Sequence, residues 1–128
     1  MALRAFVVED NRAIRDSLVE ALSELAGIVT SGVAGTEKAA IAWLADAANE
    51  WDIAIIDLVL EAGGSGLGVL SACRNRRSNQ KMVVLTGAAN PDVRSKCEAL
   101  GSDGVFDKAI ETDALMDYCM ALAQTAQT

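Results

Sequence analysis

Five short runs of apolar, often β-branched residues alternate with longer stretches in which apolar residues recur every three or four positions. A short continuous apolar run is typical of a strand buried on both faces, whereas the longer period is typical of a helix packed on one side. The alternation predicts an α/β protein with a parallel sheet covered by helices on both faces. Right-handed crossovers then leave only a few doubly wound topologies. The predicted strands are residues 3–8, 28–33, 53–60, 82–85 and 104–106.

The helical stretches carry recognisable start and stop signals. Thr36 and Asn90 are placed as N-caps, and the only proline, Pro91, follows Asn90 at the first helical position. Gly27 is placed as the C-terminal stop of the first helix. In that helix we expect a core-facing stripe of Ile14, Leu18, Leu22 and Leu25. The predicted helices are residues 11–26, 36–47, 67–76, 91–100 and 112–123, with a glycine-rich turn at 61–66.

Composition limits the class of protein. The 128 residues are 52% apolar and 23% charged, which is typical of one globular domain, here taken as residues 1–128. No apolar run is long enough to span a membrane, and the N-terminal residues do not form a signal peptide, so we expect a cytoplasmic protein. The formal net charge of −7 argues against direct binding to nucleic acid.

The basic residues, the cysteines and the lack of histidine each limit the function further. The basic run from Arg74 to Lys81 is interpreted as a solvated helix end and loop, with a docking patch for an acidic partner as the alternative. Cys73, Cys97 and Cys119 are widely separated, which favours free and mostly buried thiols. The chain has no histidine, which excludes serine–histidine triads and a phosphohistidine of its own.

Polar residues stand where the predicted strands end. Glu9 and Asp10 follow the first run, Asp57 interrupts the third, Thr86 follows the fourth and Lys108 comes just after the fifth. Since parallel strands place their carboxyl ends at one edge of the sheet, where such folds bind ligands, we expect these side chains to gather there.

The residue types in this group favour phosphoryl chemistry. Three ionised carboxylates, those of Glu9, Asp10 and Asp57, would repel one another unless one is protonated or a cation neutralises them. A hard divalent ion such as Mg²⁺ suits oxygen ligands of this kind. Lys108 adds a mobile positive charge, and Thr86 adds a hydroxyl donor. Together they would supply a carboxylate nucleophile, a metal site and two partners for phosphate oxygens.

At these positions the sequence resembles the receiver domains of response regulators in two-component systems, in particular the single-domain, chemotaxis-regulator-like members. The matching segments are FVVEDN, IAIIDLVL, VVLTGA and GVFDKA, in order along nearly the whole chain. The resemblance implies a flavodoxin-like sheet of order 2-1-3-4-5 with five helices. It also implies a phosphoprotein in signal transduction or a phosphorelay.

The resemblance further implies a role for each site residue. Asp57 would accept the phosphoryl group, while Thr86 and Lys108 would contact its oxygens. Mg²⁺ would be bound by Asp10, by Asp57 and by the backbone carbonyl of Val59, with Glu9 acting through water. The phosphodonor would be a sensor histidine kinase or a histidine phosphotransfer protein. A homodimer could form through the surface of the fourth helix, fifth strand and fifth helix.

Two departures from the family pattern concern signal relay. Ala109 follows the lysine where the family usually has proline, and Val105 stands where an aromatic ring is common. Phe106 is adjacent but points to the opposite face of a strand. One alternative is a receiver-like module that docks to a partner without phosphorylation. Another is a small Mg²⁺-dependent phosphohydrolase, which would want a second aspartate at position 59, where this chain has valine.

Overall fold

Five parallel strands form one sheet in the order β2-β1-β3-β4-β5, as the sequence and the resemblance predicted. The computed structural model describes residues 2–60 and 64–127. Residues 61–63 of the predicted glycine-rich turn lie outside the described part. The strands are β1 (Arg4–Val8), β2 (Val29–Ala34), β3 (Ile53–Ile56), β4 (Lys81–Thr86) and β5 (Gly104–Asp107).

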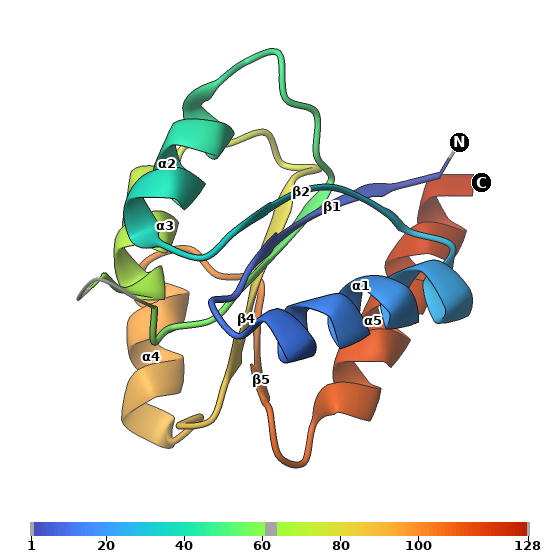
Figure 1. Ribbon diagram of the computed structural model, residues 1–128. Coiled ribbons are helices and arrows are strands. Elements are labelled where there is room, and N and C mark those ends of the chain that lie inside the picture. The colour runs from blue at the N-terminus through green and yellow to red at the C-terminus, as the bar shows by residue number, and fades with distance from the viewer. Residues whose placement is uncertain (1, 61–63, 128) are drawn as a thin grey trace.

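Helices cover both faces of the sheet, which makes the fold a three-layer sandwich (Figure 1). Two of them pack on one face and three on the other. The first pair is α1 (Arg12–Ala26) and α5 (Thr112–Gln127), which lie against each other. The second group is α2 (Glu37–Ala45), α3 (Gly66–Ala72) and α4 (Pro91–Ala99).

The central strands are buried on both faces because their side chains alternate between two hydrophobic clusters. Phe6 and Val8 of β1 belong to the cluster under α2, α3 and α4. Ala5 and Val7 belong to the cluster under α1 and α5. All four are essentially inaccessible to solvent, and this explains why these strands read as continuous apolar runs.

Aromatic stacking fixes α2 over the edge of the sheet. The indole of Trp43 stacks on the ring of Phe6, with ring centroids 4.1 Å apart and planes 4° from parallel. A Cβ on Gly32 of β2 would lie 2.6 Å from the Trp43 ring, so only glycine leaves room for it. Trp51, two residues before β3, is buried in the same cluster.

The predicted helix ends are present with the expected capping contacts. The Thr36 hydroxyl accepts a hydrogen bond from the Ala39 amide, and the Asn90 side chain accepts one from Val93. Gly27 has a φ of 64°, the left-handed conformation that favours glycine after a helix.

Three predicted boundaries were wrong by four residues, and several others by one or two. The third strand ends at Ile56 rather than residue 60, because the chain leaves the sheet at Asp57. The third helix ends at Ala72 rather than residue 76, and the last one extends to Gln127 rather than 123. The predicted stripe of α1 is also only partly buried. Leu18 and Leu22 are in the core, whereas Ile14 and Leu25 are exposed beside a groove between α1 and α5.

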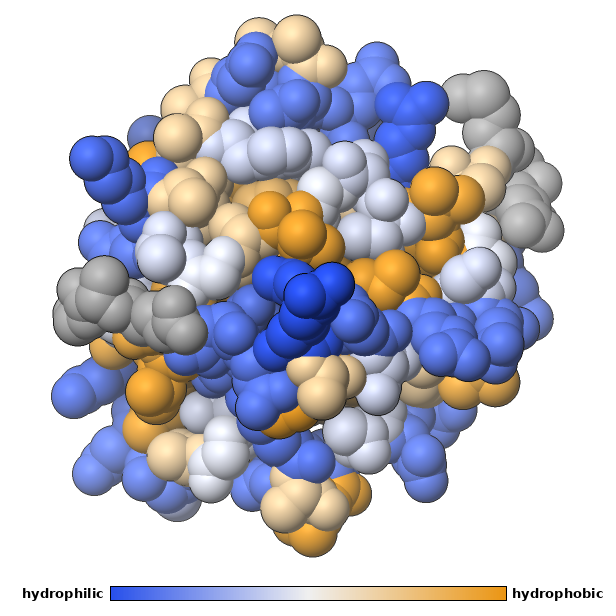
Figure 2. Space-filling view, in the orientation of Figure 1, coloured by the Kyte–Doolittle hydropathy of each residue, from blue (hydrophilic) through white to orange (hydrophobic). Residues whose placement is uncertain are grey.

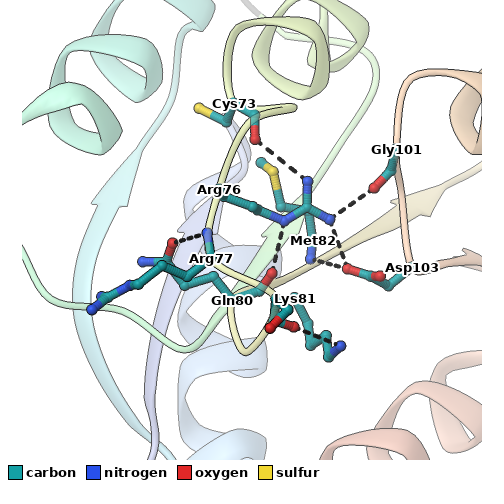
Figure 3. Close-up of polar contacts among 9 residues, drawn as sticks. Cys73, Arg76, Arg77, Gln80, Lys81, Met82, Gly101 and Asp103 are labelled. Atoms are coloured by element: carbon teal, nitrogen blue, oxygen red, sulfur yellow. Dashed lines mark hydrogen bonds and ion pairs between the residues drawn. The ribbon is translucent and has the colours of Figure 1, made fainter.

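Within the basic run, the interpretation as solvated side chains was wrong for Arg76, whose side chain is only 11% exposed. Its guanidinium donates to the carbonyls of Gln80 and Gly101 and to the carboxylate of Asp103 (Figure 3). The same carboxylate accepts the amide of Met82 at the start of β4. Arg76 therefore joins the loop after α3 to the loop between α4 and β5, at the amino edge of the sheet.

The surface is mixed in polarity and the cysteines are free. Hydrophilic and hydrophobic residues are interspersed over the face shown in Figure 2. Within the described residues, no helix has the length and apolar character needed to cross a membrane. The three cysteines are free, with Cys97 and Cys119 buried and Cys73 partly exposed, as predicted.

Candidate functional site at the carboxyl edge of the sheet

Four strands deliver the predicted site residues to one edge of the sheet. Glu9 and Asp10 directly follow β1, and Asp57 directly follows β3. Thr86 is the last residue of β4, and Lys108 directly follows β5. Because the strands are parallel, these positions share the carboxyl edge, so the expected juxtaposition holds in space.

Asp57 is buried at this edge, with 7% of the residue exposed. Its amide still donates to the Val8 carbonyl, which fixes the main chain as it leaves the sheet. One carboxylate oxygen, Oδ1, accepts the Val59 amide at 3.2 Å, and the other, Oδ2, accepts the Lys108 ammonium at 2.8 Å. A buried charge with both oxygens engaged is thus held in one orientation.

Glu9 is also buried, with 3% exposed. Its Oε1 accepts Lys108 at 2.7 Å and its Oε2 accepts the Asn11 amide at 3.1 Å. Burial raises the pKa of the Glu9 carboxyl, although the bond from Lys108 acts in the opposite direction. Asp10 is only half-buried, so of the two acids Glu9 is the one that faces the interior.

Lys108 bridges the two buried carboxylates. Burial alone would lower the pKa of its ammonium, but the hydrogen bonds to Asp57 and Glu9 outweigh burial and the pKa is raised. The ammonium therefore stays charged at neutral pH. Its backbone amide donates to the Thr86 carbonyl at 2.9 Å, which ties the residue to the neighbouring strand.

The charge at this edge fits a hard divalent cation. One oxygen from each of Glu9, Asp10 and Asp57 lies within 4.8 Å of the others. Three carboxylates against one lysine leave a negative excess when all are ionised, and oxygen-only donors are the set that Mg²⁺ prefers. The residues present therefore fit such an ion.

Thr86 lies next to this group and is 1% exposed. Its hydroxyl oxygen accepts the amide of Ala88 at 3.2 Å. Because the oxygen acts there as an acceptor, the hydroxyl proton remains available for donation. Ala88 and Gly87 add little bulk beside it, and a Cβ on Gly87 would meet nothing within 4 Å.

The described residues between Asp57 and α3 lie close to the main chain of Asp57. The Gly66 amide donates to the Leu58 carbonyl, and Val59 forms an isolated bridge with Ser65. A Cβ on Gly66 would lie 2.2 Å from the backbone oxygen of Asp57, so this approach requires glycine. Val59, two residues after Asp57, is 71% exposed to solvent.

Val105 and its neighbour Phe106 in β5 lie on opposite faces of the sheet. Val105 is buried in the cluster under α4, whereas Phe106 packs on the other side, 5.9 Å from the Tyr118 ring. Phe106 therefore does not occupy the place of Val105, as the strand periodicity indicated.

Sequence reasoning missed Arg94 and Glu111. Arg94 on α4 forms an ion pair with Glu111, which precedes α5. The two residues are 17 positions apart, so no helical or strand spacing links them. No pattern in a single sequence could have found this contact.

Comparison with known proteins finds similarity to receiver domains. The sequence profile of the response regulator receiver domain matches residues 5–119. Ethylene receptor 2 of rice, Oryza sativa subsp. japonica, is 30% identical over 119 residues, which is 91% of this chain but only 15% of the receptor. The chain therefore spans a small part of that curated relative.

Solved structures share the fold at lower identity. The receiver domain of Francisella response regulator 1452 superposes with a TM-score of 0.79 at 22% identity, covering 97% of this chain and 98% of that one. The receiver domain of a DNA-binding response regulator from Colwellia psychrerythraea gives 0.82 at 22% identity, covering 95% and 98%. The phosphorylated cyanobacterial phytochrome response regulator RcpA gives 0.76 at 22% identity, covering 95% and 91%.

Proposed function

Because this chain belongs to the receiver domains of response regulators, we propose that it takes a phosphoryl group onto Asp57 from a phosphohistidine of a partner protein. The observation that carries the proposal is the placement of Asp57. This buried carboxylate stands at the carboxyl edge of the sheet, beside Glu9 and Asp10, with Lys108 bonded to it. We propose residues 1–128 as one receiver unit.

Phosphoryl transfer to Asp57 depends mainly on how the reacting groups are positioned and on how their charge is neutralised. A carboxylate oxygen of Asp57 attacks the phosphorus, the phosphorus–nitrogen bond to the donor imidazole breaks, and the imidazole leaves with that bond's electron pair. Lys108 moves from the carboxylate oxygen to a phosphoryl oxygen. The Thr86 hydroxyl donates its free proton to another. Both residues thus stabilise charge that develops during transfer.

Mg²⁺ is the proposed cofactor, held by Asp10, Asp57 and the Val59 carbonyl. When bound, it would offset negative charge shared by the carboxylates and the incoming phosphoryl group. Glu9 is proposed to contribute through water, and its bond to Lys108 also keeps the lysine near Asp57.

The proposed partners follow from the same chemistry. The donor is a sensor histidine kinase or a histidine phosphotransfer protein, and the protein acts in the cytoplasm without contacting nucleic acid or membrane. A homodimer through the surface of α4, β5 and α5 is the proposed assembly.

The test is phosphorylation by a small donor. The purified chain is incubated with acetyl phosphate and Mg²⁺, and its intact mass is measured over time. We expect a gain of one phosphoryl group, which requires Mg²⁺ and is absent from Asp57→Asn. The matched control is Asp16→Asn on α1, an exposed aspartate with only long contacts to Arg12 and Arg15, which should be phosphorylated like the original chain.

Two results would contradict the proposal. One is an unchanged mass gain in Asp57→Asn, which would place the phosphoryl group elsewhere. The other is no gain at all with acetyl phosphate or with a phosphohistidine donor, which would favour the docking module that signals without phosphorylation.

A further inference from the structure

Arg94 lies outside the group that contacts Asp57, yet its guanidinium reaches three segments around the site. Its Nη1 donates to the Val105 carbonyl at 2.8 Å and its Nε donates to the Ala89 carbonyl at 3.2 Å. Its Nη2 forms the ion pair with Glu111. One side chain of α4 thus joins the loop after β4, the strand β5 and the loop before α5.

The loop before α5 carries Lys108 and is closed around Glu111. The Glu111 carboxylate that pairs with Arg94 also accepts the Asp107 amide at 3.1 Å. The Glu111 amide donates back to the Asp107 carbonyl at 2.8 Å, and the Asp107 carboxylate accepts the Ala109 amide at 2.7 Å. Lys108 sits inside this closed turn, and both bonds of Glu111 within the turn are to the backbone of Asp107, the residue before it.

The loop after β4 is held from the same guanidinium. Ala89 comes three residues after Thr86, whose carbonyl accepts the Lys108 amide. Arg94 therefore contacts both the loop that follows Thr86 and, through Glu111, the turn that carries Lys108. An arginine suits this role because its rigid, planar fork can donate in several directions at once.

From this geometry we infer that Arg94, acting with Glu111, is a positioning residue that holds Lys108 and Thr86 in register for phosphoryl transfer. The inference rests on the proposed function of Asp57 and Lys108. The side chains of Arg94 and Glu111 are 37% and 31% exposed, and an ion pair that exposed adds little stability by itself. We therefore expect its effect in local geometry and phosphorylation rate rather than in global unfolding.

The first experiment measures the turn directly, without phosphate. Amide hydrogen exchange is followed for Asp107, Lys108 and Glu111 in the full chain, in Arg94→Gln and in Glu111→Gln. We expect these amides to exchange on the order of tenfold faster in both variants, because the contacts closing the turn open more often. The matched control is Arg4→Gln, which removes an arginine–glutamate pair, Arg4–Glu50, at the opposite edge of the sheet and should leave these amides unchanged. Unchanged exchange in both site variants would overturn the inference.

The second experiment measures phosphorylation by acetyl phosphate and Mg²⁺. Arg94→Gln should slow the reaction on the order of tenfold, since small displacements of positioned groups cost large factors in rate. The decisive comparison is made in a Lys108→Ala background, where adding Arg94→Gln should slow the reaction clearly less than it does when Lys108 is present, because only the effect through Thr86 remains. An equal slowing in both backgrounds would show that Arg94 does not act through Lys108 and would overturn the inference.

The two proposals fail in different ways. If the unmodified chain takes no phosphoryl group, the proposed function fails while hydrogen exchange still decides whether Arg94 holds the turn. If the chain is phosphorylated but Arg94→Gln reacts at the original rate, only the role of Arg94 fails.

Discussion

Lys108 is one ammonium group placed between two buried carboxylates, and this sets what its removal should do. Glu9 and Asp57 both lose their cation if Lys108 is lost, and each is more than nine-tenths buried. An uncompensated buried charge costs far more than the net gain from an intact pair. Lys108 thus contributes to the stability of the resting protein as well as to the proposed reaction.

We predict that Lys108→Met lowers the free energy of unfolding by about 2 kcal/mol in buffer with a chelator, because two carboxylates are left unpaired. Added Mg²⁺ should restore more stability to this variant than to the original chain, since the ion then replaces the missing charge. Urea unfolding with and without Mg²⁺ measures both effects. Lys38→Met on α2, an exposed lysine with no ion pair among the described residues, is the control. Equal stability of Lys108→Met and the original chain in chelator would contradict the prediction.

At the scale of elements, the loop between β3 and α3 depends on a close backbone approach. Gly66 leaves no space for a Cβ beside the Asp57 carbonyl and the Ile56 side chain. Glu37 on α2 also accepts the Ser65 amide at 2.8 Å, so a second helix holds the end of this loop. The orientation of Asp57 is therefore set by elements on both sides of the loop.

We predict that Gly66→Ala destabilises the protein by about 2 kcal/mol or more, since the loop must move to admit the methyl group. Phosphorylation should slow as well, because the displaced backbone is that of Asp57. Gly87→Ala is the control for stability, as its Cβ would meet nothing. If calorimetry and urea unfolding find Gly66→Ala as stable as Gly87→Ala, the close approach described for this loop is wrong.

At the amino edge of the sheet, we predict a substitution that lowers stability but leaves phosphorylation unchanged. Arg76→Met should lower the free energy of unfolding by about 1–3 kcal/mol, because Asp103 and the carbonyls of Cys73, Gln80 and Gly101 lose a donor. The rate of Asp57 phosphorylation should stay unchanged, since Arg76 lies at the other edge. Arg77→Met, whose guanidinium has no hydrogen-bond partner among the described residues, should stay within about 0.5 kcal/mol. If the Arg76→Met protein is as stable as the Arg77→Met protein, the Arg76 contacts shown in Figure 3 do not stabilise the fold.

The sequence predicted the elements better than the contacts between them. Period and capping residues located all ten elements, because hydrophobic spacing and signals such as Asn90–Pro91 are local. The ends of β3 and α3 were misjudged since they depend on tertiary contacts, including the turn back to Gly66. Arg76 and Arg94 escaped prediction for the same reason: their partners are distant carbonyls and carboxylates that leave no periodic signal.

At the scale of the whole molecule, the parallel topology places the candidate site at the carboxyl edge of the sheet and the Arg76 contacts at the amino edge. The carboxyl edge gathers the site residues, which sequence order and strand ends sufficed to predict as a group. The finer arrangement, with Glu9 buried on Lys108 and Asp10 nearer to solvent, required the structure. A phosphoryl group would add roughly −1.5 to −2 charge to a protein whose formal charge is already −7. That repulsion must be offset locally.

Binding of the proposed cation should therefore stabilise the whole fold. At a free Mg²⁺ concentration of about 100 times the dissociation constant, linkage gives about 2.7 kcal/mol of added stability. We predict that thermal unfolding shows a rise in Tm with Mg²⁺ that is largely lost in Asp10→Asn and kept in Asp16→Asn. An equal rise in both variants would mean that the ion binds elsewhere.

The central claim is that Asp57 carries the phosphoryl group, and its most direct test is to locate the modified residue. The phosphorylated chain is treated with borohydride, which reduces an aspartyl phosphate to homoserine, and the peptides are then sequenced by mass spectrometry. We predict homoserine at position 57 and at no other aspartate. Homoserine at Asp10 or at an exposed aspartate, with Asp57 unmodified, would contradict the account.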